Sequence, residues 1–386
     1  MPRRISNRQP CRPTSGRAAR PLSARPRLSL ALTAALILAG GAGAWALAGP
    51  ITPPAGPVAP TLKTLSEVEP AVALATLPGD ATAQVVISQP GSYYLTADLA
   101  ATEARHAIRV LADHVTIDLR GFSLRDANPP GSFRFGIETP QARSNFVLRN
   151  GTVRGFAYMT VGAFTDSVFA DLQILDCPLG GLEVTQARNT LVRNVVVARC
   201  GEVGIRTTAG SIIQSCTVDG AFVGISTSES VVRDCVVRNS TGIGIDASAS
   251  IIEACTVSAI HSGSPTLGQG IRGQHLAQIH NNRVSDCSGP GIEVGQNSSI
   301  LENHVSFCRE GILILDFGGR GGNRVEANRL TVNQVGVKIS LAGNIVVRNS
   351  IQESAVAPTQ IVAGNSVGTL RTDAATAGPC DNLITP

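Results

Sequence analysis

The sequence predicts an all-β protein built as a single-stranded parallel β-helix, a solenoid of about eleven coils. Three observations predict this fold: a repeat of about 20 residues, short β-branched strands inside each repeat, and the lack of any segment with a ten-residue helical period. The chain of 386 residues is 43% hydrophobic, so it can bury a large core. It is only 4% aromatic, which argues against the stacking platforms that bind single-stranded nucleic acids.

Residues 1–48 are predicted to be an export signal. They hold eight arginines and no acidic residue, and the arginines precede an uncharged run of 21 residues that ends in Ala46-Leu47-Ala48. An uncleaved anchor is the alternative, because 21 residues are enough to span a bilayer. Without these eight arginines, 24 of the 32 basic residues remain against 28 acidic ones. We therefore expect no nucleic-acid partner, and membrane contact only through the signal or anchor.

The rest of the chain divides into four parts. Five prolines make residues 49–60 a stiff extended linker. Residues 61–83 are expected to cover the open N-terminal end, as solenoids require. Residues 84–370 hold the repeats as one β-helix domain, and residues 371–386 are left as a C-terminal tail.

One position of the repeat changes from cysteine to asparagine along the chain. An aliphatic residue stands three positions before it and another two positions after it in each of seven repeats. Coils stacked about 4.8 Å apart would make this position a ladder of hydrogen-bonded amides. We expect the cysteines to be buried free thiols, since their side chains would run parallel, with disulfides as the alternative. The ladder position is occupied by Cys216, Cys235, Cys255, Asn282, Asn303, Asn328 and Asn349.

Five segments carry a resemblance to a known family. PTLKTLSEVEP (60–70), ISQPGSYYLTADL (87–99), VTIDLRGFSL (115–124), FVLRNGTVRGF (146–156) and the closing stretch 344–368 resemble a family of exported bacterial right-handed parallel β-helix repeat proteins. The resemblance implies a right-handed, pectate-lyase-like fold and polysaccharide as the commonest class of ligand. It implies no particular reaction, because the close family has none assigned and a fold does not determine a function.

The best place for a site is the residue that follows each Gly-Ile or similar pair, which faces outward. Stacked coils would place these side chains in one column, with the longest insertion, residues 258–270, overhanging it near His261 and His275. In coil order the column reads Glu183, Arg206, Ser226, Asp246, Arg272, Glu293, Leu313 and Lys338.

Asp246, Arg272, Glu293 and His275 are the candidate catalytic residues. The carboxylates of Asp246 and Glu293 could act as acids or hold Ca²⁺ against an acidic sugar, and Arg272 or His275 could accept a proton. No other cofactor is expected. The alternative is that stacked opposite charges form only a solvated ladder of ion pairs on the sheet face.

We therefore expect an exported protein, secreted or associated with the cell envelope, that binds polysaccharide, a cell-envelope glycan or another extended ligand on a sheet face without catalysis. The first alternative is a polysaccharide lyase, epimerase or hydrolase that acts in a groove on the face of the Gly-Ile strands. The second is a structural surface stalk. Whether the protein is an enzyme stays open, as does its oligomeric state. A groove lined by convergent polar groups would separate the first two possibilities from the third.

Overall fold

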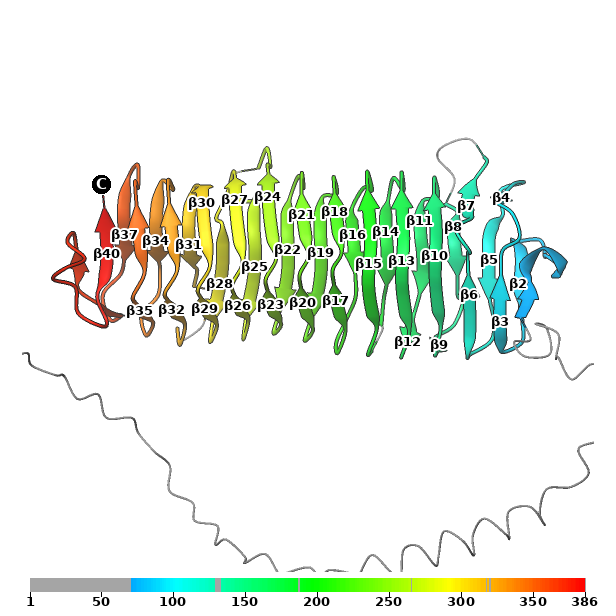
Figure 1. The fold of residues 1–386 in the computed structure, drawn as a ribbon, viewed down its shortest axis with the longest axis horizontal. Coiled ribbons are helices and arrows are strands. Elements are labelled where there is room, and N and C mark those ends of the chain that lie inside the picture. Colours follow the sequence, from blue (N-terminus) through cyan, green and yellow to red (C-terminus); the bar gives the residue numbers. More distant parts are fainter. Residues whose placement is uncertain are drawn as a thin grey trace, which may run out of the picture. The chain divides into compact units, whose positions relative to one another are not determined.

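A computed structural model describes residues 71–128, 133–186, 188–264, 266–316, 318 and 321–385, and it confirms the right-handed parallel β-helix (Figure 1). The described residues form short parallel strands and one 3₁₀ helix, η1 (Leu74–Thr76). No helix in them is long and apolar enough to cross a membrane. The predicted signal, the linker and residues 61–70 of the predicted cap lie outside the described residues.

One strand from each coil contributes to a 13-stranded parallel sheet, which we call the Gly-Ile sheet. Most of these strands begin at or next to a Gly-Ile or Gly-Val pair. They are β2 (Ala83–Ile87), β5 (His106–Val110), β8 (Phe135–Glu138), β11 (Tyr158–Gly162), β14 (Gly180–Val184), β16 (Val203–Arg206), β19 (Val223–Ser228), β22 (Ile243–Ser248), β25 (Gln269–His275), β28 (Ile292–Gln296), β31 (Glu310–Ile314), β34 (Val335–Ile339) and β37 (Ala357–Ile361).

The remaining large sheet, which we call the split sheet, has 25 strands. In most coils the chain passes through it as two short strands separated by the ladder position. The first half holds β1 (Ala71–Ala73), β3 (Gly91–Tyr94), β6 (Val115–Asp118), β17 (Ile212–Gln214), β20 (Val231–Arg233), β23 (Ile251–Glu253), β26 (Gln278–His280), β29 (Ser299–Leu301), β32 (Arg324–Glu326), β35 (Ile345–Val347) and β38 (Ser366–Val367).

The second half holds β4 (Leu99–Ala101), β7 (Ser123–Asp126), β18 (Thr217–Asp219), β21 (Val236–Arg238), β24 (Thr256–Ile260), β27 (Arg283–Cys287), β30 (His304–Cys308), β33 (Arg329–Thr331), β36 (Ser350–Gln352), β39 (Leu370–Arg371) and β40 (Asn382–Thr385). Three longer strands run through both halves: β10 (Val147–Arg154), β13 (Val168–Leu175) and β15 (Leu191–Ala198). A separate pair joins β9 (Arg143–Ser144) and β12 (Phe164–Thr165).

The solenoid has thirteen turns, where the repeat pattern predicts about eleven. Strands β2, β5, β11, β14 and β37 have no Gly-Ile or Gly-Val pair, so this pair alone does not mark every coil. At the C-terminal end, β40 pairs in parallel with β36. Residues 382–385 of the predicted tail therefore add a strand to the β-helix.

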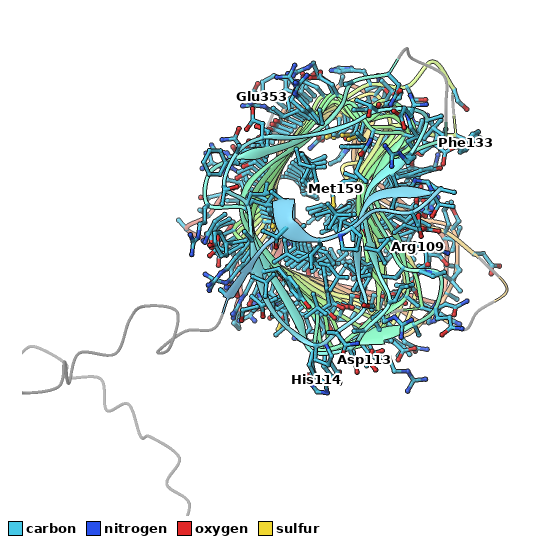
Figure 2. The ribbon with its side chains drawn as sticks, turned by 90° about the vertical axis from the view of Figure 1, so that its right-hand side faces the viewer. Arg109, Asp113, His114, Phe133, Met159 and Glu353 are labelled. Atoms are coloured by element: carbon cyan, nitrogen blue, oxygen red, sulfur yellow. The ribbon has the colours of Figure 1, made fainter. Side chains whose placement is uncertain are left out.

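The core is a stack of aliphatic side chains that fills the centre of the coil (Figure 2). Ile213, Val232 and Ile252, which precede the ladder position in successive coils, are fully buried. The glycine of the Gly-Ile pair lets adjacent coils approach. A Cβ on Gly244 would lie 2.4 Å from the carbonyl oxygen of Gly270 and 2.5 Å from Cγ1 of Val257. No larger residue fits there without moving the backbone of the next coil.

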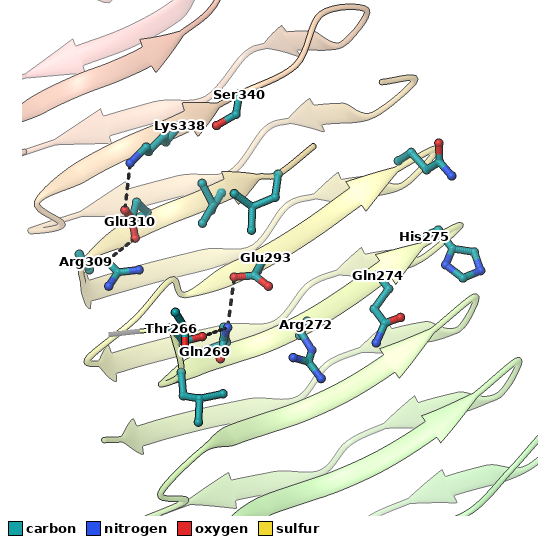
Figure 3. Close-up of a pocket in the computed structure, with 14 residues that line it drawn as sticks. Thr266, Gln269, Arg272, Gln274, His275, Glu293, Arg309, Glu310, Lys338 and Ser340 are labelled. Carbon is teal, nitrogen blue, oxygen red and sulfur yellow. Dashed lines mark hydrogen bonds and ion pairs between the residues drawn. The ribbon is translucent and has the colours of Figure 1, made fainter. Parts of the chain in front are cut away.

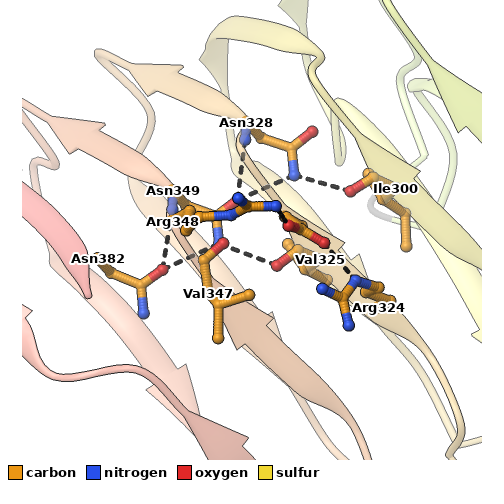
Figure 4. A network of polar contacts seen from close by, with 9 residues as sticks. Ile300, Arg324, Val325, Asn328, Val347, Arg348, Asn349 and Asn382 are labelled. Atoms are coloured by element: carbon orange, nitrogen blue, oxygen red, sulfur yellow. Dashed lines mark hydrogen bonds and ion pairs between the residues drawn. The ribbon is translucent and has the colours of Figure 1, made fainter. Parts of the chain in front are cut away.

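The asparagine ladder forms as predicted (Figure 4). Asn303 shows the pattern. Its Oδ1 accepts bonds from the backbone N and the Nδ2 of Asn282, both at 3.0 Å, and its Nδ2 donates to the carbonyl of Ile279 at 2.9 Å and to Oδ1 of Asn328 at 3.0 Å. The ladder continues one member beyond the predicted Asn349, to Asn382 in β40. It thus joins consecutive coils through fully bonded buried amides.

All eight cysteines in the described part of the chain are free thiols, and all but Cys380 are buried. The ladder thiols bond weakly to backbone carbonyls, as Cys255 does to the carbonyl oxygens of Glu253 at 3.3 Å and Val232 at 3.7 Å. In the earlier coils cysteine therefore occupies the ladder position as a small apolar residue with a weak donor, and in the later coils asparagine occupies the same position.

Candidate functional site

A groove of about 900 Å³ lies on the Gly-Ile sheet across strands β25, β28, β31 and β34 (Figure 3). The coil register brings its residues together, because each strand pairs in parallel with the next. The groove is lined by Thr266, Leu267, Gln269, Arg272, Gln274, His275, Glu293, Gln296, Arg309, Glu310, Leu313, Leu315, Lys338 and Ser340. Thr266 and Leu267 come from the long insertion, so this segment forms part of the wall.

Three of the four candidate catalytic residues line the groove: Arg272, Glu293 and His275. Asp246 lies one coil earlier, beside a smaller hollow of about 300 Å³. It accepts two hydrogen bonds from Arg272, from Nε at 3.0 Å and from Nη2 at 2.6 Å. Both side chains are about three-quarters buried or more, so this bidentate pair fixes the position of the guanidinium at the edge of the groove.

Glu293 is a buried carboxyl group, only 5% exposed. Gln269 donates its Nε2 to Glu293 Oε2 at 3.2 Å and to the carbonyl oxygen of Thr266 at 2.9 Å. Burial raises the pKa of Glu293, although the Gln269 bond and the charge of Arg272 partly oppose this. Two acceptors hold the amide nitrogen of Gln269, which leaves its buried Oε1 without a partner in the described residues. At this end of the groove the Glu293 carboxyl can therefore hold a proton, and Oε1 of Gln269 is a hydrogen-bond acceptor without a partner in the described residues.

We expect Glu293→Gln to stabilise the folded protein at neutral pH but not at low pH. A raised folded-state pKa means that the neutral carboxyl is favoured in the folded protein. The resulting stability is fully present below the usual pKa of 4.5 and is lost as pH rises through the folded-state value. Urea unfolding of both proteins from pH 4 to pH 8 measures the difference. The gain in the glutamine variant should grow with pH, and a difference independent of pH would contradict this assignment.

Glu310 is a groove residue that the predicted column misses. It is 5% exposed, accepts a bond from Nε of Arg309 at 2.8 Å and lies 3.6 Å from Nζ of Lys338. It stands just before the glycine of its coil, and Gln269 stands in the same place two coils earlier. In the paired strands this position is aliphatic, as in Val203, Val223, Ile243 and Val335. Two polar residues in an aliphatic column are the sequence signal that identifies them.

The two histidines near the insertion have different surroundings. His275 lines the groove, and its Nδ1 lies 3.2 Å from Oγ of Ser248. His261 pairs instead with Asp286, Nε2 to Oδ2 at 3.2 Å, and is not among the groove residues. Leu313 and Leu315 give the groove an apolar part, and Lys338 supplies a further charge. The groove therefore combines charged, amide and apolar surfaces.

The candidate Ca²⁺ ligands do not fit that ion. Ca²⁺ takes six to eight oxygen ligands. Both oxygens of Asp246 are bonded to Arg272, and Glu293 is bonded to Gln269 one coil away. Among the described residues there is no group of three or more His, Cys, Asp and Glu side chains that could hold a metal ion. The charged groups of this face are instead arranged as ion pairs and hydrogen bonds.

The sequence matches a family of proteins that have this fold. A family model described as "Right handed beta helix region" matches residues 136–272 and 260–352, more than half of the chain. No curated protein is significantly similar to the sequence.

Solved structures with the same architecture include the A-module of the Azotobacter vinelandii mannuronan C-5 epimerase AlgE6, with 14% identity over 82% of this chain and 99% of that chain, at a TM-score of 0.58. The A-module of epimerase AlgE4 from the same organism has 14% identity over 77% of this chain and 88% of that chain, at 0.49. Pectate lyase Pel9A has 11% identity over 70% and 66%, at 0.40. At such identities the likeness shows the fold alone.

Proposed function

The chain belongs to the right-handed β-helix family, and we propose that it binds a polysaccharide in the groove on the Gly-Ile sheet. The observation that carries the proposal is the replacement of an aliphatic column by buried Gln269 and Glu310 where the groove lies. Burying polar groups costs free energy unless they are bonded, so their presence on this face favours a binding role. The predicted export signal at residues 1–48 supports a location outside the cytoplasm as part of the same proposal.

The chemistry of the groove suits a sugar chain. Sugars present hydroxyl groups that donate and accept hydrogen bonds, together with apolar C–H faces. Arg272, Gln269 and Glu293 offer donors and acceptors, while Leu313 and Leu315 offer apolar contact. The groove also crosses four successive coils, so an extended polymer can lie along the axis of the β-helix. One solved structure with this fold is named as a mannuronan C-5 epimerase, and mannuronan is a polysaccharide, which agrees with this ligand class.

We expect Arg272→Ala to lower the affinity for the polysaccharide about tenfold or more, a loss of about 1.4 kcal/mol. The matched control is Arg206→Ala, because Arg206 stands in the same column and also pairs with a carboxylate on the preceding coil, Nη1 to Oε1 of Glu183 at 2.6 Å, but lies outside the groove. Affinity electrophoresis of the purified chain against a panel of acidic and neutral polysaccharides would measure both variants. Equal losses in the two variants, or no binding of the wild type to any polymer, would overturn the proposal.

A catalytic role is the second candidate, and Glu293 is the observation that favours it. A buried carboxyl with a raised pKa, facing a groove, is suited to donate a proton to a bound sugar. Glu293→Gln should then abolish turnover while binding persists, because the amide keeps the shape but carries no transferable proton. Product analysis by proton NMR detects lyase, hydrolase and epimerase products alike. If the wild type leaves every polysaccharide that it binds unchanged, the result contradicts a catalytic role and supports binding alone.

A further inference from the structure

Three basic side chains stand in register on the second half of the split sheet. Arg283 in β27 pairs with His304 in β30, which pairs with Arg329 in β33. Neighbouring parallel strands lie about 4.8 Å apart, so the three side chains stack along the axis on consecutive coils. We call them the basic row. The row is on a different sheet from the groove.

The row departs from the usual arrangement of arginines in this molecule. Elsewhere an arginine commonly pairs with a carboxylate on the preceding coil: Arg149 with Asp118, Arg193 with Asp171, Arg199 with Asp176, Arg206 with Glu183, Arg238 with Asp219 and Arg272 with Asp246. Arg283 and Arg329 have no ion-pair partner among the residues that the structure describes. Both are exposed, and the row is flanked in register by uncharged Thr256 and Ser350.

Like charges that stack on neighbouring strands destabilise a sheet, so the row carries a cost that the ion-paired columns avoid. The pKa of the histidine between the arginines responds to the same positive charges. Partial burial and the charges of Arg329 and Arg283 all lower the pKa of His304. The surface therefore has an uncompensated positive charge at a fixed spacing along the axis.

A row of hydroxyl groups runs beside the charges. Ser285, Ser306 and Thr331 follow the three basic residues by two positions on the same strands and pair with one another in register. Side chains two positions apart on a strand share a face, so the hydroxyls border the basic row. Oγ1 of Thr331 lies 3.4 Å from Nε2 of His304. Next to Ser306, Phe307 is 61% exposed.

We propose that the basic row binds an anionic polysaccharide, one that carries carboxylate or sulfate groups along its chain, at a site separate from the groove. The arginines would meet the anionic groups and the hydroxyl row would bond the sugar hydroxyls. The axial stacking of the row fits an extended chain rather than a single small anion.

The surface suits a glycan better than two other polyanions. Recognition of anionic membranes commonly uses clusters of 4–8 Lys and Arg residues, whereas this row is one side chain wide. Single-stranded nucleic acids are bound on series of aromatic side chains, and Phe307 is the one aromatic residue in β27, β30 and β33. The inference does not rest on the function proposed for the groove.

The test compares the double variant Arg283→Ala/Arg329→Ala with the control Arg149→Ala/Arg238→Ala, whose arginines lie on the same sheet but are ion-paired. The probes are polygalacturonate, dextran sulfate and, as the neutral polymer, dextran. Isothermal titration calorimetry of the full chain at low and moderate salt should show that the row variant loses about tenfold or more in affinity for at least one anionic polymer, and that the control does not. The wild-type affinity should fall with salt, and Arg283→Lys/Arg329→Lys should keep most of it.

The inference would be overturned by no binding of the wild type to either anionic polysaccharide, by equal loss in the control, by equal binding of dextran, or by tighter binding of a single-stranded oligonucleotide or of phosphatidylserine vesicles. Arg272→Ala separates the two sites. If it removes anionic polymer binding while the row variant binds normally, the polymer lies in the groove and the inference about the row is wrong. If the row variant alone loses binding, the row is supported whatever the fate of the groove proposal.

Discussion

Gly244→Ala is expected to destabilise the solenoid by about 3 kcal/mol or more. The added Cβ would meet the carbonyl oxygen of Gly270 at 2.4 Å and Cγ1 of Val257 at 2.5 Å. Overpacking a close-packed core typically costs about 1–3 kcal/mol, and here the obstruction is backbone that cannot move without disturbing the next coil. The urea midpoint followed by circular dichroism measures the loss.

Gly263→Ala is the matched control. This glycine lies in the insertion, and a Cβ there would meet nothing within 4 Å. We expect a change within about 0.5 kcal/mol, as for most exposed substitutions. If Gly244→Ala is as stable as Gly263→Ala, adjacent coils can separate locally at low cost, and the close approach of the glycines is not required.

The second large effect is expected for Asn303→Ala. Removing this amide leaves the backbone N–H of Asn282 and the carbonyl of Ile279 buried without the partners that they have in the ladder. Each unsatisfied buried group costs about 1–3 kcal/mol, so we expect a loss of about 3 kcal/mol or more. Thermal and urea unfolding would both show it.

Ser299→Ala is the control in the same coil, because its side chain is half-buried and makes no hydrogen bond among the described residues. It should change stability by about 0.5 kcal/mol or less. Asn303→Cys should fall between the two, since cysteine already occupies this position in earlier coils and bonds weakly to the same kind of carbonyl. Equal stability of the alanine variants at 299 and 303 would show that the ladder adds no net stability.

The sequence alone predicts the fold because, in a regular repeat, the position of a residue within its coil determines which residue of the next coil stacks on it. Aliphatic residues on both sides of the ladder position are enough to stack Asn282 on Asn303 and Asn328, and the structure confirms this stack. The last member is missed for a physical reason. Asn382 follows Asn349 by 33 residues, and Pro379 stands where the pattern has an aliphatic residue. Only the pairing of β40 with β36 brings Asn382 to the ladder.

The candidate site is predictable in part. The coil register alone places Arg272 and Glu293 on one face, and both line the groove. Whether Arg272 would pair with Asp246 or stay available to a ligand could not be predicted, because opposite charges on adjacent coils permit either arrangement. Glu310 lies outside the predicted column, because its position relative to the glycine is aliphatic in most of the paired strands. Its burial and its two cationic neighbours emerge only from the packing.

The ion pairs between coils have a direction. In the arginine or lysine pairs that join neighbouring coils in the described residues, the carboxylate comes before its partner in the chain, with two exceptions, Arg109 with Glu138 and Arg371 with Asp381. A chain that leaves the ribosome or an export channel N-terminus first would thus present each carboxylate before its arginine arrives. The arginine of each new coil would then meet a carboxylate that is already in place, so these ion pairs would favour folding coil by coil from the N-terminal end. Growth from the other end would first expose arginines that have no partner.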